Sequence, residues 1–509
     1  MRLRRASLKR GTGPLRPLLL LACVGLLVAC GGSNNNNKVN NAATSAATVR
    51  APAVSSPSVA GTPAAPGTAA ATAAAGTARA GSPAAATGSV NVNDPAAAAL
   101  AAAGGQKLSG KVTVLGTWGG SEQDSFLAMV KPFEDATGVK VEYEGTRDLN
   151  AVLTTRVQGN NPPDLAGLPG PGQMAEFARS GKLVDLGAVL DQATMKDQYA
   201  DSWLKLGQVD NKQAGIFIKA SLKGPIWYDP KTFDKVSGGS TPKTLDDLMT
   251  LADKIAASGT TPWCIGFESG AASGWPGTDW LEDIVLRQSG PDVYDQWYQG
   301  KIKWSSAQIK QAWQTWGKIV GNAKQVFGGS ATMLTTNFGD AGNPIFSNPP
   351  KCYLMHQGSF ITDFFVKANP GIKPVEDFNF FMFPDIDAKY AGSAEVAGDL
   401  FGMFKDSPQA RALIKYLTTP AAQAIWVKRG GALSPNSKVA AEIYPDKLSQ
   451  QQAQIITSAK TVRFDASDLM PEAMNNAFWK AILDFVQNPG GLDGILANLD
   501  SVQADAYKK

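Results

Sequence analysis

Histidine and cysteine are scarce in this chain of 509 residues. It contains one histidine, His356, and four cysteines, and no group of them has the spacing of metal ligands. A Cys–His nucleophilic site is not expected either, because no oxyanion loop or orienting partner accompanies His356. The sequence therefore predicts no catalytic residue, no metal site and no cofactor.

A strong basic charge and a long apolar run are also absent. The formal net charge of +4 is set by residues 1–30, which hold six basic residues and no acidic one, so the rest carries −2. This balance does not indicate a basic face for nucleic acid. The apolar run at residues 18–29 is too short to span a hydrocarbon core of ~30 Å, and it has the length of a signal-peptide core.

Residues 1–29 are predicted to be a lipoprotein signal peptide. The run ends in Leu27-Val28-Ala29-Cys30, which resembles a bacterial lipobox with a small residue before the cysteine that becomes the lipid-bearing N-terminus. We expect lipidated Cys30 to anchor the chain to the outer face of the cell membrane, since more than one acyl chain gives stable anchoring. Arg4-Arg5 fits either a twin-arginine export signal or an ordinary basic region.

Residues 30–106 are predicted to be a disordered linker. They are rich in Ala, Thr, Pro, Gly, Ser and Asn, they contain no aromatic residue, and Leu100 is their only leucine. Such a segment buries too little apolar surface to offset the entropy of ordering, and as a flexible coil it spans about 50 Å. Its alanine runs have no amphipathic pattern for docking, and whether it is O-glycosylated is left open.

Regular structure is expected from about Lys107. Residues 111–118 alternate in polarity and predict a strand, residues 121–134 predict a helix that Ser121 caps, and residues 139–143 predict a second strand. A second helix is expected over about 148–158. The β-α-β order with short turns predicts an α/β fold built on a mainly parallel sheet with helices over it.

The order of motifs resembles that of family 1 extracellular solute-binding proteins, the maltose- and oligosaccharide-binding subunits of ABC importers. Leu245 departs from the family pattern, because it replaces an aromatic residue, whereas Phe360 occupies the aromatic position where the family has tryptophan. The matching segments are Trp118-Gly119-Gly120, Pro162–Ala166, Ile216–Asp229, Thr241–Leu248, Met355–Phe360 and Glu395–Asp399.

The resemblance implies a two-lobed periplasmic-binding-protein-like fold, in which each lobe is a helix-flanked sheet and a hinge and cleft lie between them. Lobe 1 is expected over residues 107–225 plus 393–432, and lobe 2 over residues 226–392 plus 433–509. The segment from Pro262 to Trp280 resembles the alpha-glucoside-binding subgroup. The implied partners are a carbohydrate and the transmembrane permease subunits of the importer, and the protein is expected to be a monomer and not an enzyme.

Beyond the predicted signal peptide and linker, the chain has two cysteines, Cys264 and Cys352. Two separated cysteines in apolar surroundings of an exported protein predict a disulfide, with two buried free thiols as the alternative.

A sugar presents hydroxyl edges and an apolar face, so its site mixes exposed aromatics with acidic and amide side chains at loop tips. Such positions are expected where strands end and where Gly and Pro accompany tryptophan. Lys219 and Lys223 are expected to serve the crossing strands, and Trp479 to lie in the core. The substrate-binding candidates are Trp118, Glu122, Asp164, Glu268, Trp275, Asp279, Trp280, Gln357 and Asp399.

Two rival functions remain open. The same fold with a different cleft would bind a non-sugar solute. A secreted glycoside hydrolase would need two positioned carboxylates, and Glu122, Glu268, Asp279 and Asp399 are available for that role.

Overall fold

The computed structural model describes residues 94–508. The predicted signal peptide at 1–29, the lipid anchor at Cys30 and most of the predicted linker lie outside the described residues. Among the described helices, none is long and apolar enough to cross a membrane.

The first ordered strands form the predicted β-α-β unit. β1 (Lys111–Gly116) pairs in parallel with β2 (Lys140–Gly145), and α2 (Ser121–Thr137) connects them. β3 (Leu165–Leu168) pairs in parallel with the other side of β1. Ser121 begins α2 instead of capping it, because Gly120 takes the cap position with a φ of 59° that favours glycine.

A six-stranded sheet is the centre of what we call the large-sheet lobe. Its order is β11-β10-β3-β1-β2, with β6 (Gly215–Leu222) on the free side of β10 (Ser393–Met403). Every residue of β6 is buried, as expected for a strand that is covered on both faces. The other elements of this lobe are α3 (Leu149–Gln158), α4 (Pro171–Arg179), α5 (Gln192–Gln198), α6 (Asp201–Leu206), β4 (Gln208–Val209), β5 (Lys212–Gln213), α14 (Pro408–Leu417), α15 (Pro420–Arg429), α16 (Lys447–Ser458) and β11 (Thr461–Phe464).

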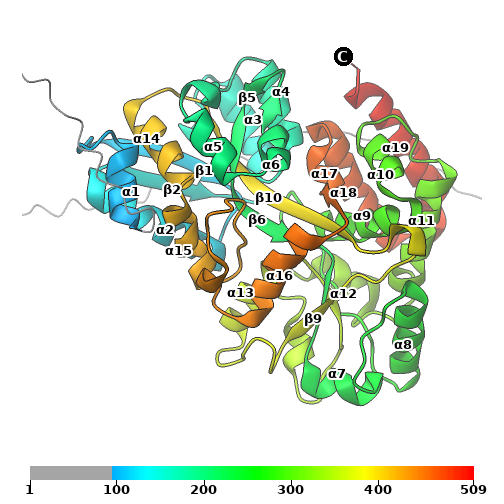
Figure 1. The fold of residues 1–509 in the computed structure, drawn as a ribbon. Helices are drawn as coiled ribbons and strands as arrows, with labels where there is room; N and C mark the ends of the chain where they lie inside the picture. The colour runs from blue at the N-terminus through cyan, green and yellow to red at the C-terminus, as the bar shows by residue number, and fades with distance from the viewer. Residues whose placement is uncertain (1–93, 509) are drawn as a thin grey trace, which may run out of the picture. The chain divides into compact units, whose positions relative to one another are not determined.

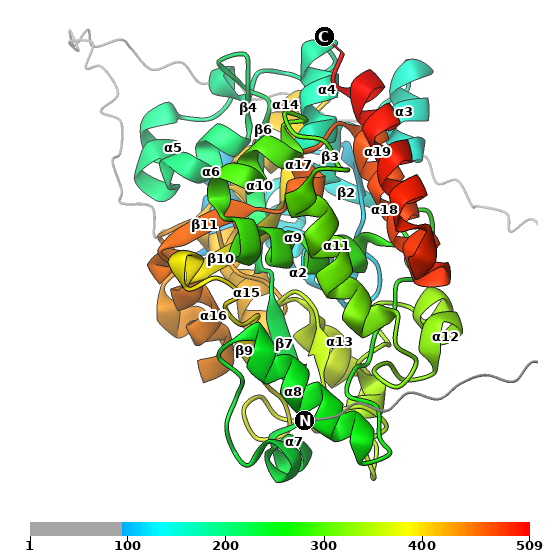
Figure 2. The same ribbon diagram turned by 90° about the vertical axis from the view of Figure 1, so that its right-hand side faces the viewer.

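A three-stranded sheet of order β8-β7-β9 is the centre of the small-sheet lobe. Four tryptophans from α10, α11 and the turn between them are buried in its core: Trp297, Trp304, Trp313 and Trp316. Figure 2 shows α18 and α19, which pack against each other, beside α11 and α9. The elements are β7 (Pro225–Tyr228), β8 (Met355–His356), β9 (Asn379–Met382), α7 (Pro230–Ser237), α8 (Leu245–Ala257), α9 (Trp275–Ser289), α10 (Pro291–Tyr298), α11 (Ala307–Val320), α12 (Gly329–Thr335), α13 (Ile361–Ala368), α17 (Ala466–Leu469), α18 (Glu472–Gln487) and α19 (Leu492–Ala506).

The lobes are joined where β6 leads into β7 and where the chain returns through β10 (Figure 1). The chain crosses once more where β11 leads into α17. Lys223 and Gly224 form the first junction. Gly224 has a φ of 84°, and a Cβ there would lie 2.7 Å from a carboxylate oxygen of Asp283, so only glycine fits. The junction therefore brings backbone close to a buried acidic side chain of α9.

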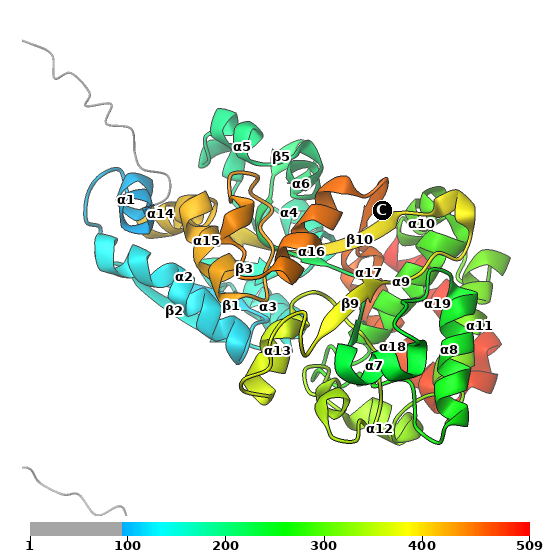
Figure 3. The ribbon, with the colours of Figure 1, turned by 60° about the horizontal axis from the view of Figure 1, so that its bottom comes forward.

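The predicted linker is wrong in its last part. α1 (Pro95–Ala102) packs against α2 and α14, and Ala99 is fully buried (Figure 3). Asp94 accepts hydrogen bonds from the first free amides of the helix, and Pro95 suits its first position. Alanine side chains are small enough for close contact between helices, so this helix docks without an amphipathic pattern.

The segment that follows α15 also differs from the expected lobe division. The sequence predicts that residues 433–464 belong to lobe 2, together with the rest of 433–509. In the structure β11 pairs in parallel with β10, from Ser393↔Thr461 to Val396↔Phe464. An antiparallel bridge between Ala220 and Leu433 adds this segment to the free edge of β6. Backbone pairing thus places it in the large-sheet lobe.

The predicted disulfide is confirmed. Cys264 and Cys352 are bonded with their Cα atoms 5.6 Å apart, and both are buried in the small-sheet lobe. The bond joins segments 88 residues apart in the chain, which restricts the unfolded chain and so stabilises the folded lobe.

Candidate functional site

A pocket of about 410 Å³ lies between the two lobes, within the size range of ligand sites. Its lining comes from the ends of β1 and β3, the junction after β6, and the helices α9 and α18. Segments far apart in the chain therefore meet around it. Its polar lining includes Glu122, Arg147, Asp148, Lys219, Ser221, Lys223, Ser269, Asp279, Asp399, Asp465, Ser467, Asp468, Glu472 and Asn476.

One face of β6 and the junction after it supplies three of these side chains. Lys219, Ser221 and Lys223 are spaced by two residues, so they project to the same side of an extended chain. Both lysines are buried, and a buried ammonium group requires paired acidic partners. Each lysine has its own set of carboxylates.

The Lys219 centre consists of Lys219, Glu122, Asp399 and Arg147. Lys219 Nζ lies 2.7 Å from Oε1 of Glu122 and 3.3 Å from Oδ2 of Asp399. Arg147 Nη2 donates to the other Glu122 oxygen at 3.2 Å. Two cations thus face two carboxylates, and the set is balanced in charge.

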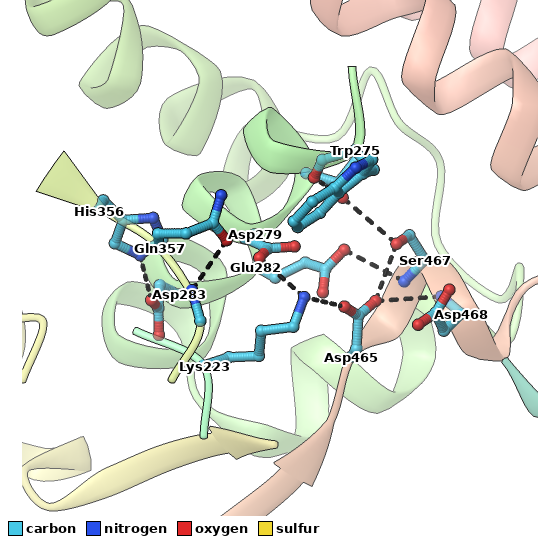
Figure 4. Close-up of polar contacts among 12 residues, drawn as sticks. Lys223, Trp275, Asp279, Glu282, Asp283, His356, Gln357, Asp465, Ser467 and Asp468 are labelled. Atoms are coloured by element: carbon cyan, nitrogen blue, oxygen red, sulfur yellow. Dashed lines mark hydrogen bonds and ion pairs between the residues drawn. The ribbon is translucent and has the colours of Figure 1, made fainter. Parts of the chain in front are cut away.

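The Lys223 centre consists of Lys223, Asp279, Asp465, Glu282 and Glu395. Lys223 Nζ lies 2.7 Å from Oδ2 of Asp279 and 2.9 Å from Oδ2 of Asp465, as Figure 4 shows. Glu282 accepts hydrogen bonds from the first amides of α17, and all five side chains are buried. Four carboxyl groups thus surround one ammonium group, and the set is rich in negative charge.

The pKa values of the carboxyl groups follow this difference. Burial raises the pKa of Glu122, but the charges and hydrogen bonds of Lys219 and Arg147 outweigh it and hold the pKa below its usual value. Burial raises the pKa of Asp279 to about 7, although Lys223 opposes the shift. Burial likewise holds the pKa of Glu395 well above its usual value, and the charges of Glu282 and Asp283 add to the effect.

Aromatic rings form the wall of the pocket on the side of the small-sheet lobe. The ring of Trp275 lies 5.1 Å from that of Phe338 and 5.9 Å from that of Phe360. Trp118 and Trp479 add two more rings to the lining. An aromatic wall opposite charged and hydroxyl groups can hold the apolar face of a polyol while its edges form hydrogen bonds.

Two contacts join the lobes at the pocket. Asp148, at the start of α3, accepts a hydrogen bond of 3.1 Å from the backbone amide of Ala271. The guanidinium of Arg147 lies 4.9 Å from the centre of the Phe338 ring. The lobes are therefore in contact through side chains that also line the pocket.

A second cavity, of about 470 Å³, lies where α13 meets the first turn of α2 and the loop after α15. Asp363 of α13 approaches Gly430 and Gly431 so closely that a side chain at Gly431 would clash with its carboxyl group. Burial raises the pKa of Asp363 to about 7, and the negative charge of nearby Glu122 contributes to the rise.

The structure brings five of the nine predicted residues together in the first pocket. They come from the end of β1, the first turn of α2, the start of α9 and the crossing strand β10. These five residues are Trp118, Glu122, Trp275, Asp279 and Asp399.

The other four predicted residues lie outside the pocket lining. Asp164 binds the backbone amide and hydroxyl of Thr113, at the opposite end of β1 from Trp118. Glu268 caps the turn at Gly270, so its neighbours Ser269 and Gly270 reach the pocket instead. Two more side chains are buried: the Trp280 ring packs on Trp263 and His356, and Gln357 bonds to the amide of Gly358.

Sequence reasoning missed several lining residues. Lys219 and Lys223 were expected to serve only the crossing strands, yet both line the pocket. A lysine inside the apolar run of β6 and a second one just after it were a usable signal, because a buried lysine requires acidic partners. Arg147, Asp465 and Trp479 lie at loop or helix positions whose approach to the pocket depends on the tertiary fold.

Comparison with known proteins identifies the family. The profile of the family described as bacterial extracellular solute-binding protein matches residues 119–424. The osmoprotective compounds-binding protein GgtB of Synechocystis sp. is 40% identical over 385 residues, which cover 75% of this chain and 90% of that protein. The alpha-glucosides-binding periplasmic protein AglE of Rhizobium meliloti is 37% identical over 78% of this chain and 89% of its own length.

Solved structures share the fold. The bacterial solute receptor AcbH superposes with a TM-score of 0.69 at 18% identity, over 79% of this chain and all of that chain. A chitin oligosaccharide binding protein also gives a TM-score of 0.69 at 18% identity, over 78% of this chain and 99% of its own. The predicted two-lobed fold is thereby confirmed, and the chain belongs to the family of bacterial extracellular solute-binding proteins.

Proposed function

We propose that this protein captures an uncharged carbohydrate, of the alpha-glucoside or short oligosaccharide class, in the pocket between its lobes and delivers it to an ABC permease. The observation that carries the proposal is the pocket itself. It combines an aromatic wall of Trp275, Phe338 and Phe360 with hydroxyl, carboxylate and ammonium groups on the facing side. No bond is made or broken in this function.

The charge pattern favours an uncharged solute. Lys219 and Lys223 are buried and each already contacts two carboxylates, so neither is free to balance an anionic group. Glu122 and Asp399 also line the pocket. Their carboxylates can accept hydrogen bonds from the hydroxyl groups of a solute, whereas they repel an anionic ligand.

A polyhydroxylated osmoprotectant is the second candidate. The relative that binds osmoprotective compounds is 40% identical to this chain, and the alpha-glucoside-binding relative is 37% identical. If the same pocket holds either class of solute, its side chains must form hydrogen bonds with uncharged hydroxyl groups in both cases. The discriminating property is therefore the size and linkage of the solute, not its charge.

Isothermal titration calorimetry of the purified globular part tests both candidates. We expect micromolar or tighter binding of at least one of maltose, trehalose, sucrose or a longer alpha-glucoside, and none of glycine betaine. Trp275→Ala should weaken this binding at least tenfold, whereas Leu127→Ala, at an exposed position on α2, should leave it unchanged. Absence of binding to every polyhydroxylated solute would overturn the proposal, and release of monosaccharides would support the hydrolase instead.

Ligand-driven closure is the proposed mechanism. A solute that touches both lobes stabilises the closed form, and one that binds open and closed forms equally does not shift their populations. Arg147 and Asp148 contact the small-sheet lobe beside the pocket and contribute to that closed form.

We also propose that the chain is a lipoprotein, with residues 1–29 removed, Cys30 lipidated and a tether that ends before α1. Mass spectrometry of the membrane-extracted protein should give an N-terminal peptide starting at Cys30 with the mass of its acyl groups. Cys30→Ser should release the protein into the soluble fraction.

We propose that the protein is a monomer, which light scattering of the released protein would test.

A further inference from the structure

The Lys223 centre carries more negative charge than its basic residues balance. Asp279, Glu282, Glu395 and Asp465 are buried around Lys223, which forms its ion pairs with only two of them. The neighbouring Asp283 is already matched by Arg287. Buried carboxylates without a partner are costly, so this centre needs a further positive charge or bound protons.

Three of these carboxyl groups converge on one point. Oxygen atoms of Asp279, Glu395 and Asp465 all lie within 4.8 Å of one another. Glu395 is fully buried, and neither of its two oxygens accepts a hydrogen bond from the described residues. Oδ1 of Asp279 is likewise without a donor, because Lys223 contacts only Oδ2 of that residue.

We propose that Asp279, Glu395 and Asp465 form a site for a hard divalent cation, with calcium as the ion that fits best. Carboxylate oxygens are the ligands that calcium and magnesium prefer. Calcium accepts irregular oxygen geometry, whereas magnesium demands a near-ideal octahedron and gives up its water reluctantly. Three buried carboxylates from separate elements of the fold therefore suit calcium better than magnesium.

Lys223 leaves room for the cation to bind. It holds Oδ2 of Asp279 and Oδ2 of Asp465, and Oδ1 of Asp465 accepts hydrogen bonds from Ser467 and from the amide of Asp468. Oδ1 of Asp279 and both oxygens of Glu395 have no donor among the described residues, so they would be the main ligands, and Asp465 would add an oxygen that is already hydrogen-bonded. Asp279 and Asp465 also line the pocket, so the ion has an entry path and can keep water ligands there. Figure 4 shows Asp279 and Asp465 on opposite sides of the Lys223 ammonium group.

The site would link the two lobes. Asp279 belongs to α9 of the small-sheet lobe, Glu395 to the crossing strand β10, and Asp465 follows β11 of the large sheet. A cation held by all three would stabilise the junction independently of any solute. The site thus goes beyond solute capture and can be examined with the metal ion alone.

Bound protons are the competing explanation for the charge balance. Burial raises the pKa values of Glu282 and Glu395 well above the usual range of a glutamate, so either carboxyl group can hold a proton. In that case the centre is neutralised without a metal ion, and added calcium has no effect on it.

Terbium luminescence tests the proposal, because Tb³⁺ replaces calcium and is sensitised by nearby tryptophan. Trp275 lies on α9 one turn before Asp279, and its ring contacts Lys223 at 5.1 Å. With metal-stripped mature protein and no sugar, we expect saturable emission from one site, displaced by Ca²⁺ at least tenfold more readily than by Mg²⁺. Glu395→Gln should weaken Ca²⁺ binding at least tenfold, and Glu376→Gln, at an exposed carboxylate, should not change it.

Emission that calcium does not displace, or that Glu395→Gln leaves unchanged, would reflect surface carboxylates and would overturn the proposal. The melting temperature of the wild-type protein gives a second readout that needs no variant. We expect millimolar Ca²⁺ to raise it by several degrees relative to the chelated protein. A melting temperature of the wild-type protein that calcium leaves unchanged would overturn the proposal, even if Glu395→Gln did not fold.

Discussion

Two buried lysines four residues apart line the same pocket, and their surroundings differ. Lys219 shares Glu122 with Arg147 and also contacts Asp399, so two cations meet two carboxylates. Lys223 meets Asp279 and Asp465, with two further carboxyl groups behind them. One centre is neutral as it stands, and the other requires protons or a cation.

The difference follows from where the partners lie. The carboxylates of the Lys219 centre belong to the large-sheet lobe, from α2 and β10. Those of the Lys223 centre come from both lobes, since Asp279 is on α9 and Asp465 follows β11. We infer that the first centre shapes the solute pocket, whereas the second holds the junction between the lobes.

Removing the charge of Lys223 should give the largest effect. Lys223→Met leaves Asp279 and Asp465 buried without their cation, and the free energy of unfolding should fall by about 3–5 kcal/mol. Urea unfolding at pH 7.5 measures this loss. Lys231→Met, at an exposed ion pair with Asp377, is the control and should change stability far less than Lys223→Met does. An equal loss in both variants would contradict the role of the centre.

Lys219→Met should lower stability less than Lys223→Met does, and it should weaken solute binding more. Arg147 still neutralises Glu122 in this variant, so we expect a loss of about 2 kcal/mol in the free energy of unfolding. The affinity for the solute should fall at least tenfold, because Lys219 lines the pocket. Calorimetry and urea unfolding of the same sample separate the two effects. A stability loss greater than that of Lys223→Met would reverse the comparison.

The sequence predicted the parts of the site that have local signals. Trp118 and Glu122 follow a strand and a Gly-Gly turn, and Trp275 and Asp279 open a helix after Gly and Pro, so their positions at the pocket were predictable. Trp280 was predicted to line the pocket but lies in the core. It follows Asp279 directly on the helix, so its side chain points in a different direction from that of Asp279.

The charged network was not predictable in the same way. Arg147 reaches Glu122 across 25 residues, and Asp465 reaches Lys223 across 242, so the pairs exist only in the folded chain. α1 was missed because alanine carries no amphipathic signal, although Asp94 and Pro95 are sequence signals for a helix start. The family resemblance, carried by the order of motifs, gave the two-lobed fold that the composition alone did not.

Asp363 adds a pH-dependent carboxyl group beside the Lys219 centre. Its pKa in the folded protein is raised to about 7, above its unfolded value near 3.9, so the folded protein holds a proton there between these values. Stability from this group is therefore complete below about pH 4 and is lost as pH rises through 7. Asp363→Asn should be more stable than the wild type by up to about 4 kcal/mol at pH 8 and equal to it at pH 4, since each pKa unit corresponds to about 1.4 kcal/mol.

Thermal unfolding from pH 4 to pH 8 measures this dependence. Charged groups near Asp363 are Glu122, Lys219 and Arg429. The pKa of Glu122 is lowered by Lys219 and Arg147, and the pKa of Lys219 is raised by Glu122 and Asp399, so these two groups stay charged over that range. Asp377→Asn serves as the control, because hydrogen bonds from Lys231 lower the pKa of Asp377, so its stability contribution is lost at low pH instead. Parallel pH profiles for the two variants would rule out the proposed titration of Asp363.

Arg147→Gln should give the smallest change in stability. Arg147 is about one-third exposed, so loss of its ion pair with Glu122 should lower the free energy of unfolding by less than about 1 kcal/mol. Its guanidinium also lies on Phe338 of the other lobe, and the variant should weaken solute binding because that contact favours the closed form. A double-mutant cycle with Phe338→Leu, measured by calorimetry, should give a coupling between the two residues only in solute binding. Coupling of equal size in unfolding would mean that the contact supports the fold and not closure, and Arg147 would then belong functionally with the Lys223 centre.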